Sequence, residues 1–358
     1  MFSLAFNFIF SILSYVLYGL FVYILFTLGV ATSAHTYEVI RRAVKKKIQE
    51  DSLPYNKKGS LHEKNVIVTG GSSGIGKSVA LLTAREGANV TLIARDSAKL
   101  ESTLEELSKC RTHPEQRFDS LSLDVASGDV ETTFARLEQK QGPCHMLICC
   151  AGTAICGKIE DTPPETLRRL LELNLVGSYR CARAVVPAMK IAKEGRIVLV
   201  GSQASLIGIF GFTAYSATKF GVRGLAESLA MELAPYNVSV TLSLPPDTDT
   251  PGFAAEEESK PIETKLMSET AGLAKPEEVA EKLLYDASDG KFFSTIGLES
   301  FMLTNLCAGM STYSSISELV LQIALMGPFR LISAFILHSF HSIVVKCMRE
   351  REKHKKSE

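Results

Sequence analysis

The stretch Val66-Ile-Val-Thr-Gly70-Gly-Ser-Ser-Gly74-Ile-Gly76 joins a short β-branched run to a glycine-rich turn. A helical pattern follows, so the turn presents backbone N–H groups and a helix N-terminus to a phosphate group. The same turn would also permit tight packing of a strand against a helix. The turn follows the first of several strand-like runs that alternate with helical patterns, and this position favours a pyrophosphate-binding turn. The residues expected to bind the cofactor there are Gly70, Ser72, Ser73, Gly74, Ile75 and Gly76.

Apolar strand-like runs alternate with helical patterns from residue 65 to residue 286. Such alternation predicts strands joined by crossover helices. Strands connected in this way form a parallel sheet covered on both faces, and right-handed crossovers give the Rossmann topology. The sequence therefore predicts an α/β fold with a Rossmann-type doubly wound parallel sheet. The predicted strands are 66–69, 90–94, 120–123, 146–150, 197–200 and 238–244.

Two basic residues near the end of the second predicted strand bear on the choice of cofactor. Arg95 stands where an enzyme that prefers NAD usually presents a carboxylate to the ribose 2′-hydroxyl. A guanidinium suits a 2′-phosphate instead, and Lys99 adds a second cation one helical turn later. Asp96 argues mildly against this reading, and a solvated loop arginine is the alternative. We expect NADPH.

The third predicted strand ends at Asp124, immediately before Val125. We expect both residues to contact the cofactor, with the Asp124 carboxylate accepting a hydrogen bond from the adenine amino group. A helix N-cap is the alternative role for this aspartate.

The segment Tyr215-Ser-Ala-Thr-Lys219, preceded by Ser202, carries the strongest catalytic signal. A tyrosine and a lysine four residues apart share one face of a helix. The ammonium is therefore expected to lower the proton affinity of the phenol and to hold the nicotinamide ribose, and both Tyr215 and Lys219 are expected to contact the cofactor. That pairing predicts Tyr215 as a general acid near neutral pH. The pair alone arises by chance on many helices, but its occurrence with the glycine turn and the serine indicates catalysis.

These residues resemble the short-chain dehydrogenase/reductase family, from Leu61 to about Gly290. The matching positions are Thr69-Gly70-(x)3-Gly74-x-Gly76, Asn174, Ser202, Tyr215 and Lys219. The resemblance implies that the last four form a catalytic tetrad. Tyr215 would protonate the carbonyl oxygen, Ser202 would polarise it and Asn174 would hold a proton-relay water. Helix-to-helix pairing into a homodimer is also common in this family.

Two stretches depart from the family pattern. Cys149-Cys150-Ala-Gly152 replaces Asn-Asn-Ala-Gly, which keeps the turn but loses a side-chain hydrogen bond. Pro245-Pro246 replaces Pro-Gly, so we expect a stiffer loop beside the nicotinamide, where Thr250 is expected to contact the cofactor. Neither change removes a catalytic group.

The run Pro245-Pro-Asp-Thr-Asp-Thr-Pro-Gly-Phe253, with Gly211-Phe-Thr-Ala-Tyr215 before it, is similar to a branch of the family that acts on sphingoid ketones. That resemblance implies reduction of the lipid 3-dehydrosphinganine to sphinganine in sphingolipid synthesis. One alternative is another membrane-borne ketone, namely a long-chain 3-ketoacyl-CoA, a steroid or a retinoid. The other is a catalytically inactive Rossmann scaffold, which would have no need of Tyr215 with Lys219.

The segment after Pro245 is acidic and precedes the predicted end of the domain. Because the sphingoid ketone carries an ammonium next to its carbonyl, we expect Asp247 or Asp249 to attract it. Ordinary solvated loop charges are the alternative. The other acidic residues are Glu256, Glu257 and Glu258.

The two ends of the chain are apolar and flanked by basic residues. Residues 1–34 contain no charged side chain and predict a transmembrane anchor, and a signal peptide is the alternative. The basic linker 35–60 places the reductase domain 61–296 in the cytosol by the positive-inside rule. Residues 297–346 predict a membrane-associated region, in which Gly327, Pro328 and Arg330 interrupt the apolar run. It is expected to be either a helical hairpin that dips into or through the bilayer or an amphipathic segment that lies on it. The tail 347–358 carries Lys355-Lys356, which resembles an endoplasmic reticulum retrieval signal read from the cytosol.

Composition excludes other classes of function. The chain of 358 residues has 39 basic and 39 acidic side chains, which gives no global attraction to nucleic acid. Its eight cysteines lack CxxC pairs and predict buried free thiols in a reducing compartment. No spacing of ligand residues suggests a metal, so none is predicted.

Overall fold

The computed structural model describes residues 61–268 and 272–357, and seven helical positions nearer the N-terminus: Leu17, Gly19, Leu20, Phe21, Tyr23, Ile24 and Thr27. The chain divides into two compact units. One comprises Lys57–Thr312 with Phe335–Glu358, and the other comprises Met1–Asn56 with Tyr313–Ala334. Apart from those seven positions, the predicted anchor 1–34 and linker 35–60 lie outside the described residues.

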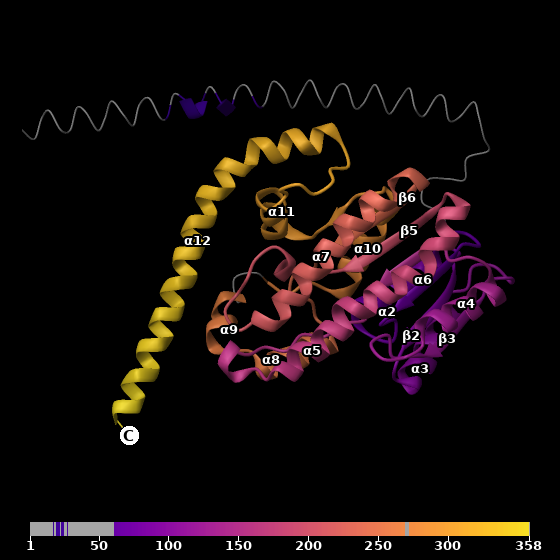
Figure 1. The fold of residues 1–358 in the computed structure, drawn as a ribbon, viewed down its shortest axis with the longest axis horizontal. Coiled ribbons are helices and arrows are strands. Elements are labelled where there is room, and N and C mark those ends of the chain that lie inside the picture. The colour runs from indigo at the N-terminus through magenta and orange to yellow at the C-terminus, as the bar shows by residue number, and fades with distance from the viewer. Residues whose placement is uncertain are drawn as a thin grey trace, which may run out of the picture. The chain divides into compact units, whose positions relative to one another are not determined.

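The centre of the larger unit is a seven-stranded parallel sheet in the order β3-β2-β1-β4-β5-β6-β7 (Figure 1). This order confirms the predicted doubly wound topology. The strands are β1 Asn65–Thr69, β2 Asn89–Ala94, β3 Phe118–Ser122, β4 Met146–Cys149, β5 Gly195–Val200, β6 Val238–Ser243 and β7 Phe293–Ser294. The seventh strand was not predicted, because two residues are too short to show a periodic pattern.

Helices cover both faces of the sheet. Successive strand residues point to opposite sides, and the apolar residues on each side are buried under helices. Ile67 of β1 packs into one buried cluster with α4, α6 and α7, whereas Val66 and Val68 pack into another with α2, α3 and α10. The helices are α2 Gly74–Arg85, α3 Ser97–Lys109, α4 Val130–Gln141, α6 Gly177–Ala192, α7 Thr213–Leu233 and α10 Pro276–Ser288.

Shorter elements lie between the main strands and helices. After β4 come η1 Ile159–Asp161, α5 Pro164–Leu170 and the π-helical turn η2 Leu171–Val176. Further 3₁₀ turns are η3 Gln203–Ser205 and η4 Ala234–Tyr236. After β6, residues 245–268, with the helices α8 Pro251–Ser259 and α9 Ile262–Ser268, form a segment that we call the lid.

The C-terminal region contains α11 Gly297–Leu306 and one continuous helix, α12 Ile316–Ser357. The helix is therefore continuous through Gly327-Pro328, where the sequence suggested an interruption. Pro328 withholds only one hydrogen bond, to the carbonyl of Ala324, and apolar helices tolerate such a loss. Among the described residues, Ile316–His354 is the one helix long and apolar enough to cross a membrane, with a mean hydropathy of 1.8 in its most apolar stretch.

All eight cysteines are free thiols, as predicted, and five of them are buried. The buried ones are Cys144, Cys149, Cys156, Cys181 and Cys347.

Candidate active site

A cavity of about 670 Å³ opens at the carboxyl ends of β1, β2 and β4. Ligands of open parallel sheets bind at this edge. Eleven of the predicted cofactor residues line it: Gly70, Ser72, Ser73, Gly74, Ile75, Gly76, Arg95, Lys99, Asp124, Val125 and Thr250. Tyr215 and Lys219, the other two, lie outside its lining.

The glycine turn owes its shape to two positions that exclude a side chain. Gly70 has φ +68°, and a Cβ there would lie 2.7 Å from the backbone nitrogen of Ala151. A Cβ on Gly76 would lie 2.3 Å from the carbonyl oxygen of Gly70. The turn therefore packs directly on the chain after β4. Ser73, the N-cap of α2, makes no side-chain cap hydrogen bond, so the first-turn N–H groups of α2 face the cavity without that partner.

Arg95 and Lys99 line the part of the cavity beyond β2. Asp96, between them, accepts a hydrogen bond from the Lys99 backbone at 3.1 Å and so caps α3. Its carboxylate is therefore committed to the helix start, although it also lies 3.8 Å from Lys99 Nζ. Within the described part of the chain, Arg95 forms no ion pair with a carboxylate. This leaves an exposed guanidinium at the cavity wall.

Asp124 and Thr250 shape other parts of the wall. Asp124 Oδ1 accepts a hydrogen bond from Ala126 N at 3.0 Å. The helix-cap alternative for Asp124 is wrong, because Asp129 caps α4. Thr250 caps α8 by accepting from Phe253 N at 3.1 Å.

Asn174 is buried at the π-helical turn η2. Its Nδ2 donates to Thr153 O and to Thr218 Oγ1, both at 3.0 Å, and its Oδ1 accepts from Thr153 N at 2.9 Å. The side chain therefore ties the loop after β4 to helix α7. Single π-turns inside helices are frequent at functional sites, because they displace backbone groups from the regular ladder.

Lys219 is 6% exposed, and its Nζ donates to the Val200 carbonyl at 2.9 Å. Gly152 lies beside both Asn174 and Lys219, since a Cβ there would be 3.1 Å from Asn174 Oδ1 and 3.8 Å from Lys219 Nζ. Burial lowers the pKa of Lys219 from 10.5 to about 8. The sequence-predicted asparagine and lysine thus meet at one point.

Ser202 and Tyr215 meet through a side-chain hydrogen bond near Lys219. Ser202 follows β5, and its Oγ accepts a hydrogen bond from Ala204 N at 3.2 Å. The Tyr215 ring centroid lies 5.6 Å from Lys219 Nζ. Burial raises the pKa of Tyr215, the negative charges of Glu256 and Asp247 raise it further, and a hydrogen bond with the Ser202 side chain opposes them. Burial and these carboxylates set the net direction of the pKa of Tyr215, and the lowering expected from Lys219 stays a prediction.

The lid contributes charges that sequence reasoning did not connect. Lys260 is fully buried, and its Nζ lies 3.4 Å from Asp247, 3.1 Å from Glu256 and 2.6 Å from Glu257. Asp247 is therefore paired with a lysine, whereas Asp249 is exposed. Lys260 stands four residues after Glu256 and three after Glu257, a helical spacing that could have predicted the ion pairs.

Sequence reasoning also missed residues that line the cavity without an obvious polar role. Backbone groups and small or apolar side chains dominate this set, and only their adjacency to the predicted strand ends signals them. They are Ile93, Ala94, Asp96, Leu123, Cys150, Ala151, Gly152, Leu173, Val200 and Gly252.

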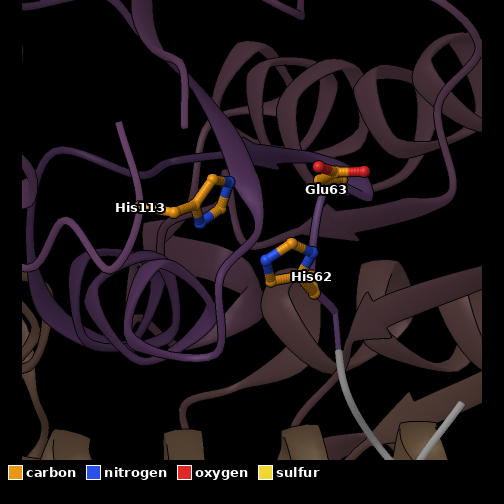
Figure 2. A group of neighbouring side chains, drawn as sticks. All are labelled: His62, Glu63 and His113. Atoms are coloured by element: carbon orange, nitrogen blue, oxygen red, sulfur yellow. The ribbon is translucent and has the colours of Figure 1, made fainter. Parts of the chain in front are cut away.

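Figure 2 shows a separate group of possible metal ligands, none of which lines this cavity. The ligand atoms of His62, Glu63 and His113 lie within 4.8 Å of one another. The two imidazole rings are stacked, with centroids 4.4 Å apart and planes 26° apart. Stacked rings direct their lone pairs side by side, whereas a metal ion requires lone pairs that converge. We therefore assign no metal to this group. The spacing of its residues in the sequence did not predict that they lie together.

Comparisons with known proteins agree with this geometry. A family model described as short chain dehydrogenase matches residues 64–261. The chain is 48% identical over 294 residues to a 3-dehydrosphinganine reductase of Danio rerio, covering 82% of this chain and 89% of the relative. It is 47% identical over 291 residues to a 3-ketodihydrosphingosine reductase of Bos taurus, covering 81% and 88%.

A solved structure shares the fold. The L-sorbose reductase of Gluconobacter frateurii, complexed with NADPH and L-sorbose, superposes with a TM-score of 0.59 and 25% identity, covering 67% of this chain and 97% of that one. The family model matches more than half of the chain, and both relatives match most of it. The resemblance inferred from the motifs is thereby confirmed: the chain belongs to the short-chain dehydrogenase family of oxidoreductases.

Proposed function

We propose that the chain reduces 3-dehydrosphinganine to sphinganine with NADPH, as a step of sphingolipid synthesis. The observation that carries the proposal is the meeting of Asn174, Ser202, Tyr215 and Lys219 beside the nucleotide-sized cavity. The names of the relatives, at 46–48% identity, supply the substrate.

A nicotinamide dinucleotide fits the residues at the cavity. The glycine turn leaves no room for side chains where Gly70 and Gly76 approach the neighbouring backbone, and α2 begins there. Arg95 and Lys99 would hold a 2′-phosphate, which favours NADPH over NADH. When bound, the cofactor supplies the hydride that reduces the carbonyl carbon.

The chain's own residues would manage the proton and the orientation of the ketone. Tyr215 is protonated at neutral pH, since its pKa is raised, and its hydroxyl can therefore donate a proton to the carbonyl oxygen as reduction proceeds. Ser202, hydrogen-bonded to Tyr215, would polarise the same oxygen. Lys219 would hold the nicotinamide ribose. Asn174 would position a water that resupplies the proton.

We further propose that the protein is held at the endoplasmic reticulum membrane, with domain 61–296 in the cytosol. The uncharged residues 1–34 and the basic linker 35–60 support an N-terminal anchor. Helix α12 presents many apolar side chains that are exposed. These are Leu321, Ile323, Met326, Leu331, Ile332, Phe335, Leu337 and Met348.

Contacts at both ends of the C-terminal region bear on its topology. Arg223 donates to Ser311 Oγ at 2.9 Å before α12 begins, and Arg351 near the end of α12 pairs with the buried Glu263 of α9. A single helix with both ends on one side of a membrane does not cross it. We therefore favour an interfacial position for 297–346 and a cytosolic tail 347–358. A glycosylation acceptor added to the tail should stay unmodified in microsomes, whereas modification would indicate a crossing.

The activity itself is tested with detergent-solubilised full-length protein. We expect NADPH oxidation with 3-dehydrosphinganine, and a fall of about 100-fold or more in Tyr215→Phe because the proton donor is lost. NADPH binding by the variant, measured by fluorescence, should persist and shows that it is folded. Turnover of only a steroid, retinoid or ketoacyl-CoA ketone would overturn the substrate and keep the mechanism. Absence of turnover with every ketone would indicate an inactive scaffold.

A further inference from the structure

The lid holds more negative than positive charge in a buried place. Three carboxylates, Asp247, Glu256 and Glu257, surround the single ammonium of Lys260, which is fully buried. The Phe253 ring, 4.7 Å from Nζ, covers the ammonium from another side. Asp247 and Glu256 are 28% and 12% exposed, so solvent screens their charges only in part. One lysine cannot neutralise this group, and the surplus is negative.

Glu256 is the member of the group whose bonding is incomplete. Its Oε1 is buried and pairs with Lys260 Nζ at 3.1 Å, and this strained ion pair is the one donor contact the oxygen has among the residues that the structure describes. A buried carboxylate oxygen normally has a well-aligned hydrogen-bond donor, and its absence is unfavourable. Burial accordingly raises the pKa of Glu256, against the attraction of Lys260. The oxygen is therefore available to a cationic donor brought by a ligand.

The lid carboxylates act on the proposed catalytic site. After burial itself, the charge of Glu256 is the largest influence that raises the pKa of Tyr215, and Asp247 adds to it. Glu256 also raises the pKa of Cys156, whose backbone N–H donates to Ser259 at the end of α8. The loop after β4, helix α7 and the lid therefore converge where Tyr215 would meet a carbonyl oxygen.

We propose that Glu256, oriented by Lys260 and assisted by Asp247, binds the ammonium group of an α-aminoketone substrate and selects it against neutral ketones. This inference rests on the proposed function and names the residue that would read the substrate's amine. The amine of such a ketone is two bonds from the carbonyl carbon. When the carbonyl oxygen of the substrate meets the Tyr215 hydroxyl, the amine therefore lies beside the lid carboxylates that act on Tyr215. Asp249, the other candidate from the sequence, is exposed and takes no part.

Selection follows from the incomplete bonding of Glu256. An ammonium completes the hydrogen bonding of Oε1 and offsets the surplus charge, so its transfer from water is compensated. A neutral ketone leaves the oxygen with Lys260 alone, which it shares with two other carboxylates. A site that hydrogen-bonds a polar group of its substrate rejects analogues without that group, because its own buried polar atoms are then left incompletely paired. A charge-assisted hydrogen bond of this kind corresponds to a change of about 10- to 100-fold in affinity.

The test compares two substrates in Glu256→Gln, which keeps the shape of the side chain and removes its charge. The substrates are 3-dehydrosphinganine and its des-amino analogue, the same long-chain hydroxyketone without the amine. We expect kcat/KM for the aminoketone to fall about 10- to 100-fold, mainly through KM, and that for the analogue to change less than threefold. Equal losses on both substrates would overturn the inference.

Glu257→Gln is the matched control, because Glu257 also pairs with Lys260 but is 37% exposed. It should leave the ratio of the two kcat/KM values within threefold of wild type, and a shift as large as that of Glu256→Gln would also contradict the assignment. Wild-type protein provides a test that needs no variant. A long-chain primary amine should inhibit turnover of the des-amino analogue at least tenfold more strongly than the matching alcohol, and equal inhibition would overturn the inference. Wild-type protein that reduces the analogue but not the aminoketone would instead refute the proposed substrate.

Discussion

Lys219 should destabilise the ligand-free fold, because its charge is buried without a carboxylate partner among the described residues. Burial lowers its pKa from 10.5 to about 8, which corresponds to about 3 kcal/mol at pH 7, where the folded and unfolded states both carry the charge. Replacement by methionine removes this penalty but also removes the hydrogen bond to Val200 O, which is worth about 1–2 kcal/mol. We expect Lys219→Met to be more stable than wild type by about 1–2 kcal/mol.

The direction of the pH dependence follows from the same shift. Between pH 8 and 10.5 the unfolded state binds more protons than the folded state, so the wild type gains stability as the pH rises. The advantage of Lys219→Met should therefore be complete below pH 8 and shrink above it. In detergent and without cofactor, thermal melts at pH 7 should show a rise of roughly 4 °C, and a smaller rise at pH 9.5.

Lys109→Met is the matched control, because Lys109 is exposed at the end of α3, and it should change the melting temperature by about 1 °C or less. A variant of Lys219 that melts below wild type at pH 7 would refute the reasoning. A stability difference that does not vary with pH would refute the role of ionisation. If Lys219→Met is more stable but inactive, Lys219 serves function at the expense of the stability of the ligand-free fold.

Two other predictions concern the cofactor cavity. Arg95→Ala should raise KM for NADPH about 10- to 30-fold and leave KM for NADH nearly unchanged. The reason is that the guanidinium has no carboxylate partner in the described chain and would meet only the 2′-phosphate. Equal effects on both cofactors in steady-state assays would contradict this. Gly70→Ala should weaken NADPH binding at least tenfold, measured by calorimetry, and lower the melting temperature. An L-residue at φ +68° costs about 1–2 kcal/mol, before the close contact of its Cβ with Ala151 is relieved. Unchanged binding would mean that the turn does not hold the phosphates.

The strands of the sheet were predictable because their apolar runs are continuous and separated by helical patterns. Strand β3 begins two residues earlier than predicted, since an edge strand that includes Asp119 lacks a full apolar run. Helix α12 continues through Pro328, where the sequence suggested an interruption, because proline weakens a helix without always ending it. Local rules describe each residue's preference, whereas these outcomes depend on neighbours that the sequence does not reveal.

The candidate site shows the same division. The spacing of Tyr215 and Lys219 correctly predicts that both lie on one helix, and eleven cofactor residues line one cavity. The net direction of the Tyr215 pKa was missed, because it depends on burial and on carboxylates from a lid that is distant in sequence. Lys260 was missed as the centre of that lid, although its spacing from Glu256 and Glu257 is helical, because only the fold shows that its side chain is buried.

The shifted groups of the site share one physical cause, which is burial of charge without full compensation. The pKa of Tyr215 is raised by burial and then by Glu256 and Asp247, while burial lowers that of Lys219. An ammonium bound at Glu256 would neutralise part of the negative charge that acts on Tyr215, and would thereby bring the pKa of the phenol closer to neutrality. A general acid transfers its proton most efficiently when its pKa lies near the working pH. The amine of the substrate would then assist proton transfer as well as binding. In the wild type kcat should therefore be higher for the aminoketone than for the des-amino analogue, and Glu256→Gln should narrow that difference, because it removes the charge for both substrates.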